Sequence, residues 1–285
     1  MRTHRSKSTD RPHRSGFTLL ELLAVITIIS ILLALIFPAI SNVLRNANNA
    51  EVNAEFMRLG QSITSFESEY NLHPWSHVIL KEEGGTWDTT SKTRIRRIWP
   101  QFNFGMDRDI NGDGDATDTF ELTASECLVF FLGGVPSAPG TTGVMGFSKN
   151  PINPFSRGGT NRTVPHEFDV SRLVDTDGDG MWEYADTVSE TPLIYVCSNN
   201  GQGYSTADGS LNYYMQADGA TPWKPNGYQI ISAGEDQEFG FNPAPNPFDS
   251  SGGATDSRPR FGEDMEITGE QADNLVSFRN GKLGN

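Results

Sequence analysis

Residues 16–21 read Gly16-Phe17-Thr18-Leu19-Leu20-Glu21, and the chain from Leu22 to Leu44 then carries no charged side chain. That run is about 23 residues, or roughly 35 Å of helix at ~1.5 Å per residue, enough to cross a bilayer core of roughly 30 Å. Glu21 stands alone near its start, where an unpaired charge in hydrocarbon would be costly. The stretch therefore predicts a membrane-spanning helix that opens with one carboxylate.

The leader before Phe17 is short and basic. It holds five basic residues and one acid, namely Arg2, Arg5, Lys7, Arg11 and Arg14 with Asp10. Basic flanks stay in the cytoplasm, so everything after Pro38 is predicted to cross the membrane. Removing the leader, whose net charge is +4, takes the formal charge from −14 to −18. Such an acidic exported part argues against nucleic acid as a partner and favours bound divalent cations.

The segment from Gly16 to Glu21, with the apolar helix behind it, resembles the N-terminal signal of type IV pilins and type II secretion pseudopilins. In that family a prepilin peptidase cuts after the glycine and methylates the new N-terminus. The resemblance implies cleavage between Gly16 and Phe17, N-methylation of Phe17, and a helix kink at Pro38. It also implies an assembly role for Glu21, which would pair with the α-amino group of Phe17 in an adjacent subunit. The alternatives are a simple membrane anchor and a Sec signal peptide, which would want a shorter apolar region and a small-residue cleavage site.

Beyond Pro38 the apolar residues keep helical spacing as far as Tyr70, and Asn71 ahead of His73-Pro74 ends the helix. The periodic residues are Val43, Ala47, Ala50, Val52, Phe56, Leu59, Ile63, Phe66 and Tyr70. The predicted parts are a cleaved leader (1–16), a transmembrane and assembly helix (17–40), an amphipathic helix (41–71) and a globular domain (72–285). The fold class is α+β, the type IV pilin-like fold: a long helix on a small antiparallel sheet, with loop-rich calcium-binding insertions.

Few segments of the globular domain read as regular structure. Strands are predicted at 193–197, 211–215 and 227–232, and a helix at 124–131 should hold Cys127 in its apolar face. Residues 71–125 otherwise read as a polar stretch with one acidic loop.

Two C-terminal segments extend the resemblance to the major (G-type) pseudopilin. Residues 228–236 resemble the strand and turn of that subunit, and residues 273–278 resemble its closing segment. Residues 242–260 form a Pro/Ser/Gly insertion that compact members of the family lack.

Two acidic loops repeat oxygen-bearing residues in the ligand order of an EF-hand calcium loop. In the first, the ligands are Asp107, Asp109, Asn111, Asp113 (through its carbonyl), Asp115 and Asp118, with Gly112 at the sharp turn. In the second, they are Asp175, Asp177, Asp179, Met181 (through its carbonyl), Glu183 and Asp186, with Gly180 at the turn. Both loops end in Asp instead of a bidentate Glu, which predicts weak calcium sites outside an EF-hand fold. The alternative is two solvated Asp-Gly turns.

Two further features keep their alternatives. A third calcium site near the C-terminal loop, which the resemblance implies, would use Glu235, Asp236, Glu238 and Asp273. Cys127 and Cys197 could form one disulfide in an exported domain, or could be two buried thiols.

Catalytic patterns are missing from the sequence: the five histidines lack a metal-hydrolase spacing, and there is no nucleophile elbow or phosphate loop. The resemblance implies a non-enzymatic, single-pass inner-membrane subunit, with its N-terminus cytoplasmic before processing and its C-terminal domain periplasmic. As a pseudopilin it would build a homo-oligomeric filament that drives protein export. Its partners would be other pseudopilins, the inner-membrane secretion platform and the prepilin peptidase. The alternatives are a minor type IV pilin for adhesion, motility or DNA uptake, and a surface hydrolase on a pilin-type anchor.

Overall fold

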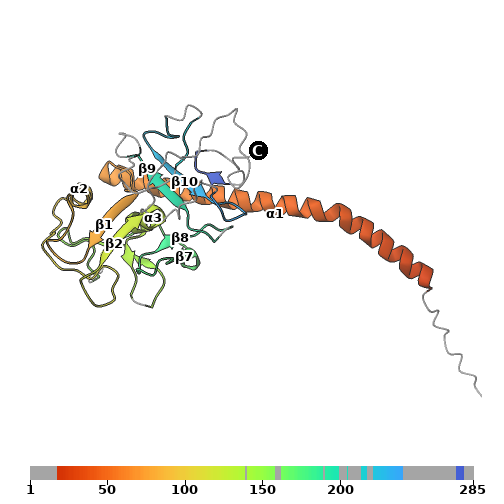
Figure 1. Cartoon of the computed structure of the whole chain (residues 1–285), viewed down its shortest axis with the longest axis horizontal. Coiled ribbons are helices and arrows are strands. Elements are labelled where there is room, and N and C mark those ends of the chain that lie inside the picture. The colour runs from red at the N-terminus through yellow and green to blue at the C-terminus, as the bar shows by residue number, and fades with distance from the viewer. Residues whose placement is uncertain are drawn as a thin grey trace, which may run out of the picture. The chain divides into compact units, whose positions relative to one another are not determined.

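The computed structural model describes residues 18–138, 140–157, 162–188, 190–198, 204, 213–216, 221–239 and 274–278. The chain divides into two compact units, Met1–Ala47 and Asn48–Asn285. Helix α1 (Leu19–Tyr70) runs through both units (Figure 1).

The first unit consists of the apolar half of α1. Thr18 and Glu21 cap its start, because the Thr18 N–H donates to Glu21 Oε2 at 2.9 Å and the Glu21 N–H donates to Thr18 Oγ1 at 3.2 Å. The large apolar side chains of this half are exposed, from 45% at Val25 to 84% at Leu19. Among the described residues, α1 is the one helix long and apolar enough to cross a membrane. The predicted apolar helix is present, and the described part of the chain leaves its side chains uncovered.

Helix α1 is unbroken through Pro38 and ends where the sequence predicted. Asn71 takes a left-handed conformation (φ 56°), and its N–H donates to the Glu67 carbonyl at 2.7 Å. This closes the last turn just ahead of the His73-Pro74 pair.

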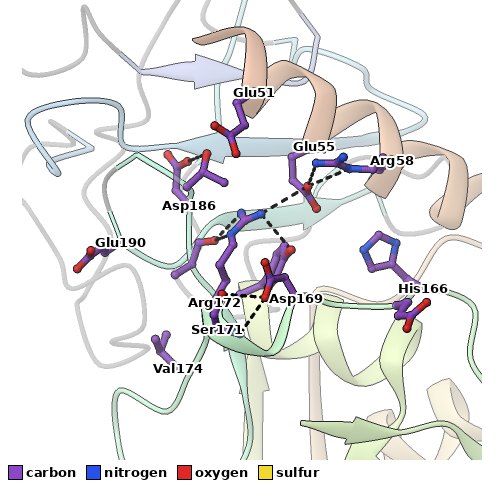
Figure 2. A pocket seen from close by; sticks show the side chains of 14 residues that line it. Glu51, Glu55, Arg58, His166, Asp169, Ser171, Arg172, Val174, Asp186 and Glu190 are labelled. Carbon is purple, nitrogen blue, oxygen red and sulfur yellow. Dashed lines mark hydrogen bonds and ion pairs between the residues drawn. The ribbon is translucent and has the colours of Figure 1, made fainter. Parts of the chain in front are cut away.

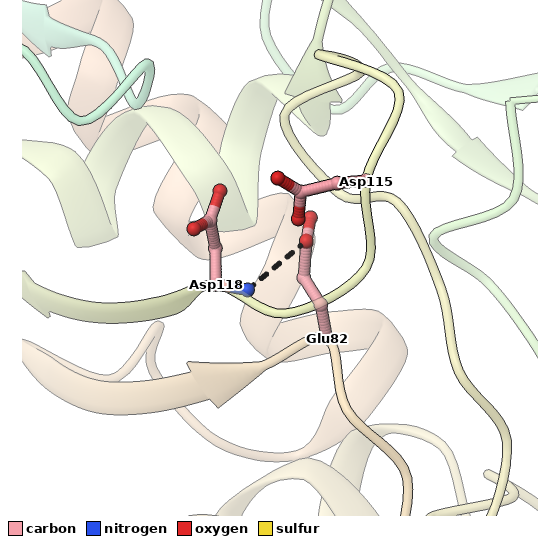
Figure 3. A group of neighbouring side chains, drawn as sticks. All are labelled: Glu82, Asp115 and Asp118. Carbon is pink, nitrogen blue, oxygen red and sulfur yellow. Dashed lines mark hydrogen bonds between the residues drawn. The ribbon is translucent and has the colours of Figure 1, made fainter.

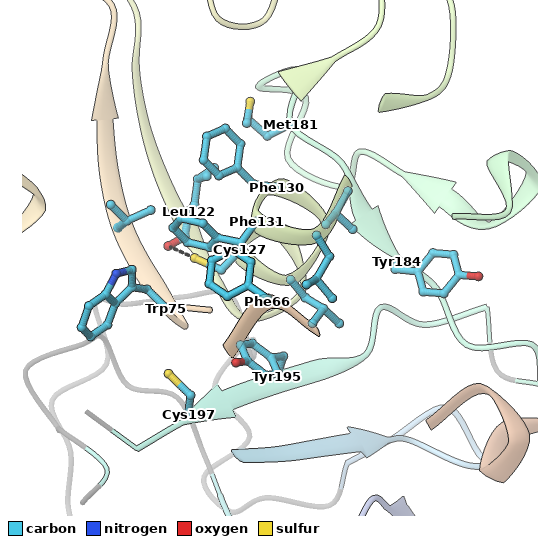
Figure 4. Packing of buried hydrophobic residues seen from close by; sticks show 14 of the residues in the cluster. Phe66, Trp75, Leu122, Cys127, Phe130, Phe131, Met181, Tyr184, Tyr195 and Cys197 are labelled. Carbon is cyan, nitrogen blue, oxygen red and sulfur yellow. Dashed lines mark hydrogen bonds between the residues drawn. The ribbon is translucent and has the colours of Figure 1, made fainter. Parts of the chain in front are cut away.

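The second unit is built around a buried stripe of α1 and helix α3 (Ala124–Gly133). The stripe consists of Val52, Phe56, Leu59, Ile63 and Phe66, all at most 6% exposed. Every residue of α3 is buried. The Phe66 and Phe131 rings meet edge to face with centroids 6.1 Å apart (Figure 4). The spacing of apolar residues beyond Val52 therefore predicted the core face of α1 correctly.

The interpretation of 71–125 as a polar stretch was wrong, because it contains three regular elements. Strands β1 (His77–Lys81) and β2 (Thr119–Thr123) pair antiparallel, and helix α2 (Thr89–Ile98) lies between them in the sequence. The signal was weak because α2 buries only Ile95 and Ile98 as apolar residues, and its other side chains are polar or basic. Its N-cap, Asp88, accepts a hydrogen bond from the Ser91 N–H at 2.9 Å.

A three-stranded antiparallel sheet in the order β11-β10-β9 carries most of the predicted strand signal. It consists of β9 (Ile194–Cys197), β10 (Tyr228–Ser232) and β11 (Leu275–Val276). The strand expected at 211–215 lies partly outside the described residues, and Met215 forms a single bridge with Pro222. Three short pairs complete the unit: β3 (Val135–Pro136) with β4 (Val144–Met145), β5 (Phe147–Ser148) with β6 (Arg162–Thr163), and β7 (Leu173–Val174) with β8 (Glu183–Tyr184).

Candidate functional site

The first acidic loop folds around Asp109. The Asp109 carboxylate accepts hydrogen bonds from the N–H groups of Gly112 and Gly114, the latter at 3.2 Å. Asp107, by contrast, accepts from the Gly84 N–H at 2.8 Å. Gly112 and Gly114 both have positive φ, so either glycine could form the sharp turn of the loop. The loop could therefore begin at Asp107 or at Asp109, and the observed backbone corresponds to the start at Asp109. The structure thus places Asp109 where the sequence had placed Asp107, at the first position of the loop.

The remaining side chains of this loop brace its own backbone. Asn111 accepts from the Asp113 N–H at 3.1 Å, Asp113 from the Asp115 N–H at 2.9 Å, and Asp115 from the Thr117 N–H at 2.9 Å. Each bond joins a side chain to the backbone two residues on, which is the Asx-turn pattern. One oxygen of each of these residues is thereby used inside the loop.

A carboxylate from outside the loop joins it. Glu82, fully buried just after β1, accepts hydrogen bonds from the N–H groups of Ile110 and Asp118. One carboxylate oxygen from each of Glu82, Asp115 and Asp118 lies within 4.8 Å of the others (Figure 3). Burial, as the main cause, raises the pKa of Glu82 and of Asp118. Glu82 could not be predicted from the loop motif, because it precedes the loop by 25 residues or more.

The second loop keeps the register predicted from the sequence. Asp175 accepts from the N–H groups of Gly178 at 2.8 Å and Gly180 at 3.1 Å. Asp177 accepts from the Asp179 N–H at 3.3 Å, and Asp179 from the Met181 N–H at 2.7 Å. The bonds from Asp175 repeat those of Asp109, so the two loops have the same internal geometry.

Glu126 of α3 is the outside carboxylate of the second loop. It is 5% exposed, and its Oε2 accepts from the Thr123 N–H at 2.9 Å, as part of the cap of α3. One oxygen from each of Glu126, Asp177 and Asp179 lies within 4.8 Å of the others. Burial raises the pKa of Glu126 to about 9 and that of Asp179 to about 6. This crowding of carboxyl groups is what a divalent cation would relieve.

Two predicted ligands of the second loop, Glu183 and Asp186, lie outside the carboxylate group at Glu126. Glu183 is buried and accepts from the Thr176 N–H at 3.1 Å and from its hydroxyl. Burial raises the pKa of Glu183 to about 7. Asp186 accepts from the Val188 N–H at 3.1 Å and from the Ser232 hydroxyl, away from the group at Glu126. Asp186 therefore lies outside the carboxylate group that Glu126 forms with Asp177 and Asp179.

The two loops lie against each other. A β-carbon at Gly180 would stand 3.4 Å from Cβ of Asn111. On the other side of the first loop, the Arg157 guanidinium covers Gly112 and donates to the Ile110 carbonyl at 3.0 Å. Both groups offer carboxylate oxygens and no His or Cys, a hard donor set that fits calcium or magnesium better than zinc.

The third predicted calcium site does not form a carboxylate group among the described residues. Of the third calcium set, Asp273 lies outside the described residues, and Asp236 accepts from the Glu238 N–H at 2.9 Å. No carboxylate group that includes Glu235, Asp236 or Glu238 occurs among the described residues.

The disulfide that the sequence allowed is not formed. Both Cys127 and Cys197 are buried thiols. The Cys127 thiol donates to the Leu122 carbonyl at 3.3 Å (Figure 4). The Cys197 thiol lies 3.6 Å from Ser76 Oγ. Each thiol thus has a local partner on a different strand or turn.

At the N-terminus, the processing residues Gly16 and Phe17 lie outside the described residues. Residues 11–37 match the family model of the prokaryotic N-terminal methylation motif. The chain has a prepilin-type N-terminus. No curated protein and no solved structure matches the chain. The match supports a type IV pilin-like protein, with an apolar helix suited to membrane anchoring and a leader suited to a prepilin peptidase.

The match at residues 11–37 points to a structural pilin-like subunit. Three histidines of the second unit have local partners. His73 lies 3.4 Å from a Glu67 oxygen, His77 lies 3.1 Å from Glu121 Oε1, and His166 Nδ1 lies 2.7 Å from Ser62 Oγ. These contacts hold the end of α1, β1 and the segment before η1 (Val170–Arg172) in place.

Proposed function

We propose that this chain is a pseudopilin of a type II secretion system, which polymerises through α1 into a periplasmic filament that drives protein export. The observation that carries the proposal is the exposed apolar half of α1, most of which lies within the methylation motif at residues 11–37. Lipid covers such a helix before assembly, and the same helices of neighbouring subunits cover it afterwards. The subunit would be a single-pass inner-membrane protein with its second unit in the periplasm.

Glu21 would then have two successive partners. In the single chain its carboxylate holds Thr18 through the N–H and the hydroxyl, both at 2.9 Å. After cleavage, the new α-amino group of Phe17 in an adjacent subunit offers a cation. An ion pair at this depth neutralises both charges in a medium where either alone would be costly. The capping bonds hold the carboxylate at the start of the helix until that amine arrives.

Processing is tested by the variant Gly16→Val in cells that contain the prepilin peptidase. The variant should accumulate as a precursor heavier by the 16-residue leader, measured by intact mass, while Ser8→Ala in the same leader should mature normally. Maturation of Gly16→Val at the wild-type site would contradict the peptidase assignment.

Assembly is tested by Glu21→Gln, which keeps a hydrogen-bonding group but removes the charge. The variant should be cleaved normally, and filaments sheared from the cells should fall at least tenfold. Thr27→Ala, which removes another polar group of the apolar half, is the matched control. Filaments of Glu21→Gln at the wild-type level would contradict the pairing.

A minor type IV pilin is the second candidate, and the methylation motif fits it equally well. Deleting the gene and comparing the export of extracellular enzymes with twitching motility and DNA uptake separates the two. Loss of export alone supports the pseudopilin. Loss of motility or DNA uptake with normal export supports the minor pilin.

We further propose that the two acidic loops bind calcium. The support is the pair of buried glutamates, Glu82 and Glu126, each brought by the fold to the carboxylates of one loop. On this basis the ligand sets are Asp109, Asn111, Asp113, Asp115, Asp118 and Glu82 for the first loop, and Asp175, Asp177, Asp179, Met181 through its carbonyl and Glu126 for the second. Bound calcium would fix the loops that connect α2 to β2 and β7 to β8.

A further inference from the structure

A polar pocket of about 730 Å³ opens in the second unit, beside the first turns of α1 that belong to it (Figure 2). Its walls come from α1, from η1 with β7, and from β8 with the segment that follows. The charged lining residues are Glu51, Glu55, Arg58, Glu167, Asp169, Arg172, Asp186 and Glu190. Six carboxylates thus face two guanidinium groups among the described lining residues.

The floor of this pocket is neutralised internally. Glu55 is 4% exposed and pairs with both Arg58 and Arg172, the latter at 3.5 Å. The Arg172 guanidinium also donates to the Ala185 carbonyl, and its Cζ lies 4.1 Å from the Tyr184 ring centroid. The Asp186 carboxylate accepts from the Ser232 hydroxyl and the Val188 N–H. These groups are held by one another and by the fold.

The rim of the pocket carries the excess charge. The carboxylates of Glu51, Glu167, Asp169 and Glu190 are on exposed residues. His166 does not offset them at neutral pH, because its burial lowers its pKa. Charges of one sign around a hollow attract a cationic ligand and disfavour an anionic one.

Helix α2 presents the opposite charge. Its ten residues include Lys92, Arg94, Arg96 and Arg97 and no acid. Arg94 is buried and donates to the His77 carbonyl, but Arg96 and Arg97 are exposed in the last turn. The guanidinium carbon of Arg96 lies 5.1 Å from the Phe104 ring centroid, and that of Arg97 lies 5.6 Å from the Trp75 ring. The aromatic rings hold these two cations in place at the surface.

The pocket and α2 lie at opposite ends of the buried stretch of α1. The pocket lies at Glu51 to Arg58, whereas α2 is near the helix end, where the Tyr70 and Trp99 rings are 6.5 Å apart. The 12 residues from Arg58 to Tyr70 span roughly 18 Å at ~1.5 Å per residue. Figure 1 shows α2 well separated from β7 and β8 within the second unit. The basic turn of one copy is therefore not available to the pocket of the same copy.

We propose that this acidic pocket receives the Arg96–Arg97 turn of α2 from a second copy of the chain. The contact joins two different surfaces, so it is heterologous, and repeating it produces an open polymer and not a closed dimer. Two subunits with parallel α1 helices, displaced along the helix axis, bring the pocket of one level with α2 of the other. The inference rests on the proposed filament, to which it adds a specific contact between the periplasmic units.

Cross-linking of the full-length protein in membranes tests the contact while all charges stay in place. Thr93→Cys lies on the exposed side of α2, and Val170→Cys, at a position 50% exposed, lies between the pocket residues Asp169 and Ser171. Cells that produce both variant chains should yield a mixed dimer with a short bismaleimide. The yield should exceed at least fivefold that of Thr93→Cys with Ile152→Cys, whose cysteine replaces an exposed residue beside Asn103. The native cysteines are buried and do not compete.

Charge reversal identifies the groups responsible. Arg96→Glu with Arg97→Glu should lower the mixed-dimer yield at least fivefold, and adding Glu51→Arg with Glu190→Arg to the partner chain should restore it. Lys149→Glu, an equal type of change at another exposed position, should leave the yield unchanged. High salt should weaken the wild-type signal, because these charges are solvent-exposed.

A mixed-dimer yield no higher than that of the Ile152→Cys control would overturn the contact. So would unchanged cross-linking in the reversed variants. If sheared filaments are still present in either case, the filament proposal stands without this interface. If filaments and the mixed dimer are both lost in Glu21→Gln, the contact depends on assembly through α1, as proposed.

Discussion

The two acidic loops share an alternation of aspartates and an internal hydrogen-bond pattern, but the fold holds them differently. The first lies between α2 and β2, is largely exposed, and meets Glu82 at the end of a strand. The second lies between β7 and β8 and meets Glu126 in the first turn of α3, a helix buried along its whole length. A cation in the first loop would fix a surface connection, whereas one in the second would act on the core. If both loops bind calcium as proposed, the same motif would serve local order in one place and global stability in the other, depending on the element that supplies the outside glutamate.

Calcium removal should have the largest effect. A site filled at 100 times its Kd stabilises the folded state by about 2.7 kcal/mol. Stripping both loops of the full chain in detergent should therefore lower Tm by on the order of 10 °C, at about 2–4 °C per kcal/mol for a domain of this size. Differential scanning calorimetry with chelator, and then with calcium restored, measures this. A Tm that ignores calcium up to several millimolar would reduce both loops to solvated turns.

The pH dependence of the metal-free protein should come mainly from the second loop. Burial raises the pKa of Asp179 to about 6 and that of Glu183 to about 7, above their ordinary values of 3.8 and 4.5. Between about pH 4 and pH 7 the folded state therefore binds more protons than the unfolded state. The free energy of unfolding falls as pH rises through this range. Melting of metal-stripped protein across this range should show a falling Tm, on the order of 5 °C. Saturating calcium should flatten the profile, and a metal-free Tm that rises with pH would contradict the burial of these groups.

Removing the first carboxylate of each loop should separate the two loops. Asp109→Asn and Asp175→Asn each keep one oxygen, which can accept from one of the two glycine N–H groups, but lose the second acceptor and the charge of the ligand. Each should weaken calcium binding at its own loop about tenfold, or ~1.4 kcal/mol, measured by isothermal titration calorimetry. At saturating calcium each variant should also lose part of the calcium-dependent rise in Tm, and the loss should be larger in Asp175→Asn, because its loop meets a buried helix. Equal Tm effects of the two variants would show that the first and second loops contribute equally to the stability of the fold.

The outside glutamate of the second loop should show its role only when calcium is present. With a pKa of about 9, Glu126 is protonated in the metal-free protein at pH 7, so Glu126→Gln should change stability by less than about 0.5 kcal/mol. The glutamine can still accept the Thr123 N–H. With calcium the variant should lack the stabilisation that the wild type gains from the second loop. Full stabilisation of Glu126→Gln by calcium would remove Glu126 from the ligand set.

The smallest effect is expected from the residues that the fold uses elsewhere. Asp107→Asn should leave calcium affinity within about twofold of wild type, because Asp107 bonds to Gly84 and not to the loop. Asp186→Asn should do the same for the second loop. A tenfold loss in Asp107→Asn would restore the register with Asp107 as first ligand.

The sequence predicts those features well that depend on residues close together in the chain. The charge-free run behind Glu21, the spacing of Val52 to Phe66 and the buried helix at Cys127 each depend on near neighbours, and the structure has all three. The register of the first loop was ambiguous, because aspartates at alternate positions fit either glycine.

What the sequence did not predict depends on long-range packing. Nothing in the sequence around Glu82 or Glu126 links them to the acidic loops, and only the fold of β1 and α3 brings them there. Helix α2 was missed because its cations mask a narrow apolar face of Ile95 and Ile98. For the two glutamates, the loops that they contact lie far away in the chain.

The exposed apolar side chains of residues 19–44 limit how the subunit can leave the membrane. In the proposed filament, this segment would leave the lipid only when the same segments of other subunits replace the lipid around it. Extraction from the membrane and incorporation into the filament would then be a single event. A subunit that missed that moment would be stranded in the bilayer, not lost to the aqueous compartment.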